Sequence, residues 1–485
     1  MLKKPILKIL LSIVSFFIVV GLFLINSNTV NITFLSQQQK QVIKKYVFPY
    51  HVISQQEQII SQQEQIISQQ TISQQEQTIS QQEQLFSERD ELRNVINNLA
   101  LNLELNTKES LKNIKTKKEV INLSKNLQVD KYYLLTGFYF GINIQYPGSG
   151  YIDFYKDNLI ILSSRGVLAF AENFENRGEF KQIKNNIDDF IGLEQYEKNN
   201  WFSIKDLLVS DDKVYVSFTE ELKDNCWNTS IIFGNMNYEE IIFKKLFSAD
   251  ECIHSTNNTD KDFNAHQSGG RIISFDKNHI LLTTGEYRSR YLAQDEASLN
   301  GKVLKINIVN GNYEIISMGH RNPQGLFFDK DNNIILETEH GPQGGDEINI
   351  IEVSKISQDT VQNYGWAISS AGEHYPGVIQ KNPTIYEKYP LHKSHSEFGF
   401  IEPIKSFVPS IGISEIVKID QNKYVVSSLK GKSIYFFELG GQNKIINFEQ
   451  IEVFERIRDL KYKNNRLYLF MEDSASIGIV NISDF

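Results

Sequence analysis

One pattern recurs six times in the chain and limits its fold more than any other feature. Each copy has an apolar strand end, a polar turn and then a strand rich in β-branched and aromatic residues. The copies read FYKDNLIILSS from 154, SDDKVYVSF from 210, SFDKNHILLTTG from 274, FFDKDNNIILETEHG from 327, KIDQNKYVVSSLKG from 418 and LKYKNNRLYLFMED from 460. Asp and Asn suit tight turns between half-buried strands. Six such hairpins predict an all-β, six-bladed β-propeller; a large β-sandwich with unrelated turns is the alternative.

Composition narrows the function classes. The chain has 485 residues, which at about 150 residues per domain would allow three domains, although a propeller can be longer. Aromatic residues make up 12% of the chain, enough for a sizeable core, so wholesale disorder is excluded. Two cysteines cannot build a disulfide framework or a four-thiolate metal site. The net charge of −9 argues against nucleic acid as the main partner.

The N-terminus predicts a membrane anchor. Residues 9–25 are apolar apart from Ser12, Ser15 and Gly21, and lysines precede them. With its leading apolar residues this run approaches the roughly 20 residues that span a bilayer. The lysines should stay in the cytoplasm, so the rest of the chain would be exported. A cleaved signal peptide is the alternative, but no Ala-x-Ala-like cleavage site follows the run.

A Gln-rich repeat separates this anchor from the propeller. From Ile53 the unit ISQQEQI recurs with a seven-residue period, which indicates a helix in a coiled coil. A solvated Gln-rich helix or a disordered tract is the alternative. The apolar residues Leu85, Leu92, Ile96, Leu99 and Leu103 then follow 3–4 spacing, which favours an oligomerising helix near 85–105. The predicted domains are therefore 1–26, the cytoplasmic tip and transmembrane helix; 27–130, a helical stalk with the Gln-rich heptad repeat; and 131–485, the six-bladed propeller.

Three stretches hold more Gly, His and charge than turns require. They are HQSGGR at 266–271, GHRNPQG at 319–325 and EHGPQGGDE at 339–347, the last leading to NYGW at 363–366. Each alone is explained by an ordinary loop. Together on one propeller they offer a base, a guanidinium for an anion, and oxygen ligands for a hard cation such as Ca²⁺.

These stretches also carry a family resemblance, from about residue 150 to 485. In GHRNPQG, EHGPQGGDEIN, NYGW and the late ERIRD stretch at 455–459, the chain resembles the PQQ-dependent glucose/sorbosone dehydrogenases of the soluble aldose sugar dehydrogenase type. That family is a six-bladed propeller, as the hairpins predict independently. The resemblance alone implies the cofactor PQQ.

The resemblance implies roles for residues that match its motifs. His266 matches the base that removes the proton of a sugar's anomeric hydroxyl while a hydride passes to PQQ, giving a lactone. Arg321 and Asn322 match the pair that flanks the cofactor and stabilises charge on it. The other implied residues are cofactor contacts Tyr375, Arg456 and Arg458, Ca²⁺-binding carbonyls of Gly341 and Pro342, and a second Ca²⁺ site at Glu347 and the carbonyl of Tyr364.

The chain also departs from the family pattern. Residues 203–211, SIKDLLVSD, replace a Gly-rich Leu-Leu stretch that runs into His-Pro-Asp-Phe, which puts contacts from that loop in doubt. Glu286 stands where the family has Asp. A family lysine near the cofactor has no secure match, although Lys405 is close to its place. Extra residues between Glu347 and Tyr364 could disturb the second metal site.

The two cysteines flank a hairpin-like arrangement of apolar runs. Cys226 and Cys252 enclose residues 231–233 and 241–243, and in an oxidising compartment they could form a disulfide. Two free buried thiols are the alternative.

Two functions follow from these features. The first is a quinoprotein sugar dehydrogenase, held by a single helix in the inner membrane with its propeller in the periplasm or outside the cell. It would use PQQ and Ca²⁺, an aldose substrate and an electron acceptor that the sequence leaves unknown, and its stalk could join copies into a homo-oligomer. The second is a non-catalytic propeller that binds a glycan or protein at the cell envelope.

Overall fold

The computed structural model describes residues 62, 81–92, 94–96, 98–139, 148–199, 201–356, 361–375 and 383–483. The chain divides into two compact units, Met1–Leu92 and Arg93–Phe485. In the first unit the described residues are helical. In the described part of the chain, no helix is long and apolar enough to cross a membrane. The apolar run 9–25 and most of the Gln-rich repeat lie outside the described residues, so the predicted anchor and coiled coil stay predictions.

The second unit is a β-propeller. Its six inner strands each contact the next, and the last contacts the first, so they form a closed ring. These strands are β3 (Gly150–Tyr155), β8 (Ile204–Ser210), β14 (Gly269–Asp276), β18 (Pro323–Asp329), β23 (Ile413–Asp420) and β27 (Ile457–Lys463). The antiparallel partners that follow them are β4 (Asn158–Ser163), β9 (Lys213–Lys223), β15 (His279–Thr284), β19 (Ile334–Glu339), β24 (Lys423–Ser428) and β28 (Arg466–Met471). The predicted six-bladed, all-β fold is confirmed.

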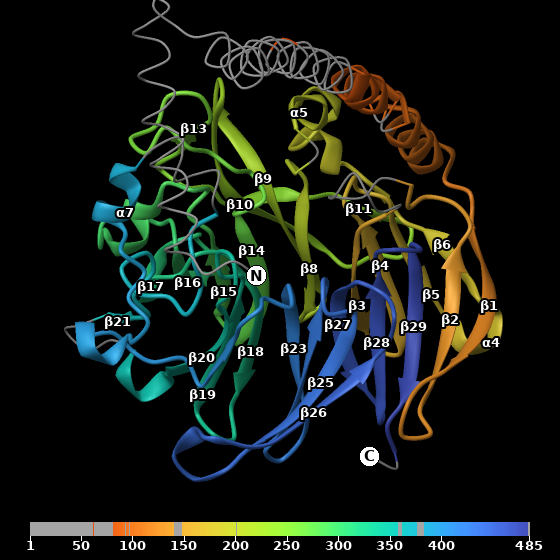
Figure 1. Cartoon of the computed structure of the whole chain (residues 1–485). Helices are drawn as coiled ribbons and strands as arrows, with labels where there is room; N and C mark the ends of the chain where they lie inside the picture. Colours follow the sequence, from red (N-terminus) through yellow and green to blue (C-terminus); the bar gives the residue numbers. More distant parts are fainter. Residues whose placement is uncertain are drawn as a thin grey trace, which may run out of the picture. The chain divides into compact units, whose positions relative to one another are not determined.

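Further strands extend each blade outward (Figure 1). The third and fourth strands are β5 (Leu168–Ala171) and β6 (Glu179–Gln182); β10 (Cys226–Asn235) and β12 (Lys244–Phe247); β16 (Lys302–Asn307) and β17 (Tyr313–Met318); β20 (Asp346–Glu352) and β22 (Lys405–Phe407); β25 (Ser433–Leu439) and β26 (Ile445–Glu452); and β29 (Ser476–Asn481) with β2 (Gln128–Leu134). Shorter elements are β7 (Lys184–Asn185), β11 (Glu240–Ile241), β13 (Ile253–His254), β21 (Gln362–Asn363), α4 (Phe174–Arg177), α5 (Leu193–Lys198) and α7 (Thr384–Lys388).

The turns between first and second strands explain why the hairpins can be read from sequence. Asn464 and Asn465, between β27 and β28, have φ of 51° and 57°. Asn333, before β19, has φ of 53°. Asn tolerates this left-handed region better than other residues with a side chain. The Asp- and Asn-rich turns therefore supply the backbone conformation that reverses the chain.

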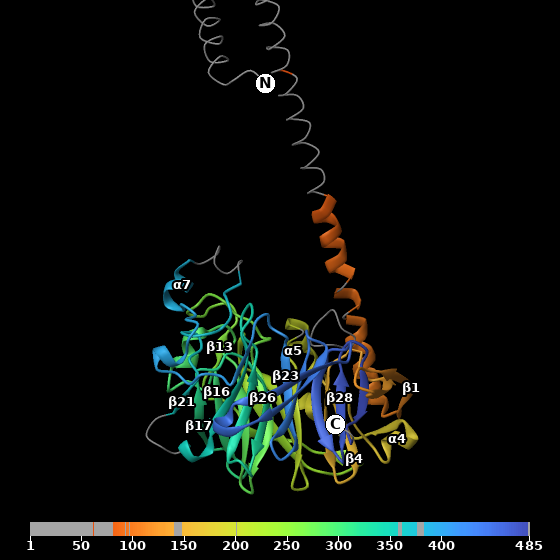
Figure 2. The ribbon, with the colours of Figure 1, turned by 60° about the horizontal axis from the view of Figure 1, so that its bottom comes forward.

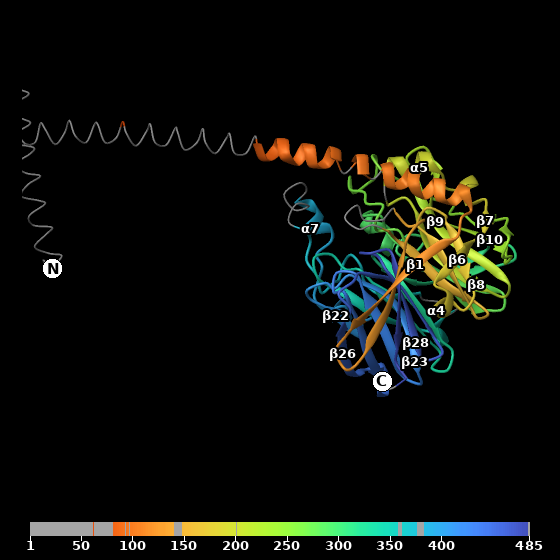
Figure 3. The same ribbon diagram turned by 90° about the vertical axis from the view of Figure 1, so that its right-hand side faces the viewer.

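An N-terminal hairpin closes the ring. β1 (Ile114–Asn122) pairs with β2, and β2 pairs with the C-terminal strand β29, while β1 also pairs with β6 of the first blade. In Figure 1, orange β2 lies beside blue β29, and Figure 3 shows β1 beside β6. Two blades thus merge into one nine-stranded sheet. The sequence assigned 114–130 to the helical stalk. That assignment is wrong for these residues because they form β1, the connection after it and the start of β2.

A helix leads into β1 at the side of the propeller (Figure 2). Residues 98–110 are helical, and Leu101, only 3% exposed, packs into the core of the first two blades. Leu99 and Leu103 are more than half exposed, at 58% and 52%. The apolar residues that the sequence places at 3–4 spacing are therefore on a helix. In the single chain, the side chains of Leu99 and Leu103 are exposed to solvent.

Buried ion pairs connect four of the inner strands beside the central channel. The Arg271 guanidinium on β14 contacts Asp206 on β8 at 2.7 Å, Glu415 on β23 at 2.8 Å and Asp459 on β27 at 2.9 Å. All four side chains are buried. Buried charges of this kind are stable only when they are paired, so the network fixes the spacing of the inner strands.

Cys226 and Cys252 form a disulfide. Cys226 begins β10, and Cys252 precedes β13, which pairs with β10. Of the two alternatives that the sequence left open, the structure has the bridge.

Candidate active site

The predicted catalytic residues come together at one end of the propeller, where the inner strands begin. His266 precedes β14, Arg321 and Asn322 precede β18, and Arg458 is the second residue of β27. Inner strands surround the central channel of a propeller, so side chains at their starting ends face a common space. Residues far apart in sequence thereby become neighbours.

His266 is held beside aromatic and cationic groups. Its ring centroid lies 4.8 Å from that of Trp201 and 6.2 Å from that of His340. The Asn264 side-chain oxygen accepts a hydrogen bond from the His266 backbone amide at 2.9 Å. Burial, reinforced by His340 and Arg458, holds the pKa of His266 well below its ordinary value. The imidazole is therefore neutral at neutral pH and able to accept a proton.

Arg321 and Asn322 are fixed by their surroundings. Arg321 donates from Nη1 to the His340 carbonyl at 2.8 Å, and its guanidinium lies 5.3 Å from the Trp366 ring centroid. The Asn322 side-chain oxygen accepts a hydrogen bond from the Gly269 backbone N–H, with an N···O distance of 3.1 Å. That contact leaves the Asn322 amide nitrogen Nδ2 buried without a hydrogen-bond partner.

Arg456 and Arg458 share a buried carboxylate. Arg456 Nε donates to Glu472 at 3.1 Å and Arg458 Nη2 donates to it at 3.0 Å. The two arginines hold the pKa of the Glu472 carboxyl below its ordinary value despite its burial. Arg458 also contributes to the low pKa of His266, so it belongs to the same electrostatic environment. Its Nε is buried without a hydrogen-bond partner.

Lys205 is a further member of this cluster that the sequence did not single out. It lies on β8, is 8% exposed, and donates from Nζ to the Trp201 carbonyl at 2.6 Å. Burial is the main reason that the pKa of Lys205 lies well below its ordinary value, and the positive charge of Arg458 is the second reason. Gly270 makes room for it: a Cβ at Gly270, whose φ is 116°, would lie 2.3 Å from the Lys205 Cβ.

Lys405, the nearest sequence candidate for the family lysine, lies elsewhere. It is on the outer strand β22, with Nζ 5.0 Å from the Phe448 ring centroid. The sequence signal for Lys205 was its place in the stretch 203–211, where the chain departs from the family pattern.

The predicted metal residues, together with Arg321 and Tyr375, line two small hollows that share Arg321 and Trp366. Pro342 and Tyr375 line one of them with Arg321, and Tyr375 is 40% exposed. Gly341, Glu347 and Tyr364 line the other, also with Arg321. The structure thus brings the predicted residues of the second Ca²⁺ site to one place.

The donor groups of the cluster fit an acceptor-rich ligand such as PQQ. Asn322 Nδ2, Arg458 Nε and His340 Nε2 are buried without hydrogen-bond partners. Leaving such atoms unpaired costs stability, about 1–3 kcal/mol for each group. A molecule with carboxylate and carbonyl oxygens would accept hydrogen bonds from Asn322 Nδ2 and Arg458 Nε. It would also accept one from His340 in the tautomer that carries the proton on Nε2.

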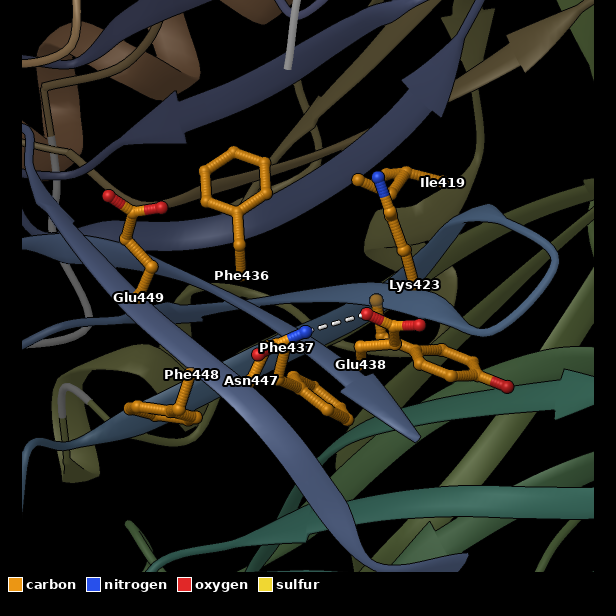
Figure 4. A pocket seen from close by; sticks show the side chains of 9 residues that line it. Ile419, Lys423, Phe436, Phe437, Glu438, Asn447, Phe448 and Glu449 are labelled. Carbon is orange, nitrogen blue, oxygen red and sulfur yellow. Dashed lines mark hydrogen bonds between the residues drawn. The ribbon is translucent and has the colours of Figure 1, made fainter. Parts of the chain in front are cut away.

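A hollow of about 650 Å³ lies on the blade formed by β23–β26 (Figure 4). Phe437 and Phe448 line it together with Lys423 and Glu449, and Asn447 donates to Glu438 at 2.8 Å. None of the predicted site residues lines this hollow. It is separate from the cluster around His266.

Comparisons with known proteins define the class. A family model described as glucose / sorbosone dehydrogenase matches residues 204–480, more than half of the chain. The chain therefore belongs to the glucose/sorbosone dehydrogenase family.

Two curated relatives are similar over part of the chain. Aldose sugar dehydrogenase YliI of Escherichia coli (strain K12) is 27% identical over 237 residues, which cover 44% of this chain and 59% of that protein. Quinoprotein glucose dehydrogenase B of Acinetobacter calcoaceticus is 33% identical over 182 residues, covering 29% of this chain and 38% of that protein. The chain thus spans well under two thirds of the length of these relatives.

Solved structures share the fold. The soluble aldose sugar dehydrogenase from Escherichia coli, in its apo form, superposes with a TM-score of 0.55 at 22% identity, covering 76% of this chain and 99% of that one. The PQQ-bound aldose sugar dehydrogenase from Streptomyces coelicolor superposes with a TM-score of 0.52 at 17% identity, covering 73% and 98%. At this identity the likeness establishes the propeller alone.

Proposed function

We propose that the protein is a PQQ-dependent aldose dehydrogenase that oxidises the anomeric hydroxyl of a sugar to a lactone. The observation that carries the proposal is a neutral, half-buried imidazole, His266, next to fixed cationic side chains at the channel mouth. Family membership supports the same reaction class.

Each residue of the cluster has a chemical task in this reaction. His266 accepts the proton of the anomeric hydroxyl, because its depressed pKa keeps a nitrogen lone pair free. Arg321 and Asn322 offer donors to acceptor oxygens of the cofactor, which stabilises negative charge that develops there. PQQ, when bound, supplies a two-electron acceptor for the hydride that leaves the anomeric carbon.

The proposed function also includes two bound Ca²⁺ ions. The carbonyls of Gly341 and Pro342 would hold the ion beside Arg321, and Tyr375, Arg456 and Arg458 would contact the cofactor. Glu347 and the Tyr364 carbonyl would hold a second, structural Ca²⁺. Hard oxygen ligands of this kind suit Ca²⁺.

The test uses the purified full-length chain with added PQQ and Ca²⁺, a panel of aldoses and an artificial electron acceptor. We expect His266→Gln to retain PQQ binding by calorimetry and to lose about 10²–10⁴-fold in turnover, the usual contribution of a general base. The matched control is His279→Gln, a surface histidine paired with Asp276 at 2.9 Å. It should leave turnover unchanged.

Absence of PQQ binding by the wild-type chain would contradict the dehydrogenase. It would favour the second candidate, a non-catalytic propeller that binds a glycan or protein. The observation that favours this candidate is the stretch 203–211, where the chain departs from the family pattern.

We also propose that residues 9–25 anchor the chain in the inner membrane, with the propeller in the periplasm or outside the cell. The lysines before an apolar run support this orientation. Membrane fractionation with and without alkaline carbonate, combined with protease access to the propeller in spheroplasts, tests it. Release by carbonate or protection from protease would contradict the anchor or its orientation.

A further inference from the structure

A histidine and two glutamates converge in the interior of the fourth blade. Ligand atoms of His320, Glu337 and Glu339 all lie within 4.8 Å of one another, and the three residues are buried. His320 Nδ1 is 3.3 Å from Glu339 Oε1 and 3.7 Å from Glu337 Oε2. Ligands around one tetrahedral ion at about 2.0–2.2 Å lie roughly 3.3–3.6 Å apart, so the two distances from His320 are already close to those of a metal site.

Strand geometry places these groups together. Glu337 and Glu339 are two residues apart on β19, so their side chains lie on the same face. On the neighbouring strand β20, Asn349 is opposite Glu337 and Glu347 is opposite Glu339. His320 reaches the same face from the loop between β17 and β18, with its ring 4.9 Å from the Tyr364 ring. Five polar groups therefore share one buried face.

Within the described ranges, the basic partners of the carboxylates on this face are histidines. Among the described residues, no lysine or arginine nitrogen forms an ion pair with Glu337, Glu339 or Glu347. The nearest imidazole to Glu347 is that of His395, with Nε2 3.6 Å from Oε1. Such a cluster calls for a cation or for bound protons.

The histidine is oriented as a metal ligand. His320 Nε2 and the Ser317 hydroxyl lie 2.8 Å apart. If Nε2 donates to Ser317, Nδ1 carries its lone pair toward the two carboxylates. A hydrogen bond of this kind from the second ring nitrogen fixes tautomer and ring direction in metal sites.

Unpartnered oxygens at the cluster are a second, independent indication. Glu337 Oε1 and Asn349 Oδ1 are buried and have no hydrogen-bond partner. Both residues are fully buried, with 0% exposure. Asn349 Nδ2 donates to Glu337 Oε2 at 3.0 Å and to Glu339 Oε1 at 3.2 Å, so the amide head lies against the cluster. Oδ1 therefore points away from the carboxylates, and a half-turn of the amide, which a bound cation would favour, would direct it to them.

We propose that His320, Glu337 and Glu339 bind a divalent transition-metal ion, with the amide oxygen of Asn349 as a fourth ligand. One imidazole nitrogen with carboxylate oxygens suits ions such as Zn²⁺ or Mn²⁺, whereas Ca²⁺ takes oxygen ligands. Its ligand set differs from that of the adjoining Ca²⁺ site predicted at Glu347 and Tyr364, whose hollow Glu339 also lines.

The ion would act on the neighbouring cluster through the backbone. Glu339 Oε2 accepts the amide of Arg321 at 2.5 Å, while Glu339 Oε1 faces His320. A metal on Glu339 would therefore fix the carboxylate that holds the segment before β18, where Arg321 lies. Glu339 is a positioning residue in this arrangement.

The experiment measures binding directly, without enzyme activity. The full-length chain is stripped of metal by chelation and titrated with Zn²⁺ and with Mn²⁺ by calorimetry, and bound metal is counted by mass spectrometry after dialysis. We expect one ion per chain, and at least a tenfold loss of affinity in His320→Gln and in Glu337→Gln. His279→Gln, the control for a surface histidine next to a carboxylate, should bind as the wild type does.

Three results would overturn the proposal. The wild-type chain could bind no ion, which would mean that the cluster holds protons. Binding could be unchanged in both variants. Binding could be lost in Glu347→Gln but kept in His320→Gln, which would place the ion at the Glu347–Tyr364 site. If the variants do not fold, X-ray absorption of the Zn²⁺-loaded wild type decides: a first shell of oxygens without imidazole nitrogen excludes the site.

Discussion

At the scale of single residues, the environment of His266 determines the acidic side of the pH profile. Burial and the nearby His340 and Arg458 lower its pKa well below the ordinary 6.5. Because only the neutral imidazole accepts a proton, activity should persist as the pH falls through 6.5 and decline only further down. We expect the acidic limb of kcat/KM below pH 6.5 when it is measured with saturating PQQ. A limb at or above that value would contradict this assignment.

Lys205 contributes to the same pKa and offers a second residue-level prediction. Its charge is among the causes that lower the pKa of His266. Replacing it in Lys205→Met removes that charge and keeps the aliphatic stem, so the acidic limb should move to higher pH. The control is Lys223→Met, at the exposed end of β9 in the same blade. An unmoved limb in Lys205→Met would show that Lys205 does not influence His266.

These two residues also show what sequence can reveal at this scale. His266, Arg321 and Asn322 were predictable because each lies in a loop motif with more Gly, His and charge than a turn needs. Lys205 lies within a strand of mixed apolar and charged residues, and its partner Trp201 is marked by no motif. Its burial depends on Gly270, 65 positions along the chain and in the next blade. Only the closed ring of strands creates that neighbourhood.

At the scale of elements, the disulfide ties β10 to the segment that carries β13. It closes a loop of 26 residues, for which loop-closure entropy gives about 3.5 kcal/mol of stabilisation. We expect the Cys226→Ser/Cys252→Ser double variant to lose about 2–4 kcal/mol in denaturant unfolding. Reductant should destabilise the wild type by a similar amount and leave the double variant unchanged. Equal unfolding midpoints in all four conditions would contradict a structural role.

The hairpins were the elements that sequence predicted best. Their turns depend on a few adjacent residues, such as Asn464 and Asn465, and local chemistry is readable from local sequence. β1 and β2 were missed. Their partners β6 and β29 lie far along the chain, and the helical pattern that ends near residue 110 suggested a longer stalk.

At the scale of the whole molecule, β2 joins the two ends of the propeller. It forms the outer strand of the last blade beside β29 and passes directly to β1, which extends the first blade. Val129, Tyr132 and Leu134 of β2 are buried, at 0%, 2% and 8% exposure. At about 1.5–3 kcal/mol for each buried side chain of this size, the strand contributes on the order of 5 kcal/mol. That is comparable to the net stability of many domains.

A pair of fragments tests this closure. A fragment of residues 98–485 keeps the helix, β1 and β2, and should be soluble, with a single cooperative unfolding transition. A fragment of residues 136–485 lacks both strands and leaves β29 and β6 as unpaired edges, which favour association. We expect it to aggregate or to unfold at least 5 °C lower, since about 1 kcal/mol shifts the midpoint of a large domain by roughly 2–4 °C. Size-exclusion chromatography and thermal unfolding measure both outcomes. If the two fragments have equal midpoints and both elute as monomers, the six blades close without the N-terminal hairpin. The domain boundary near residue 130, which the sequence pattern favoured, would then mark the start of the part that folds as a propeller.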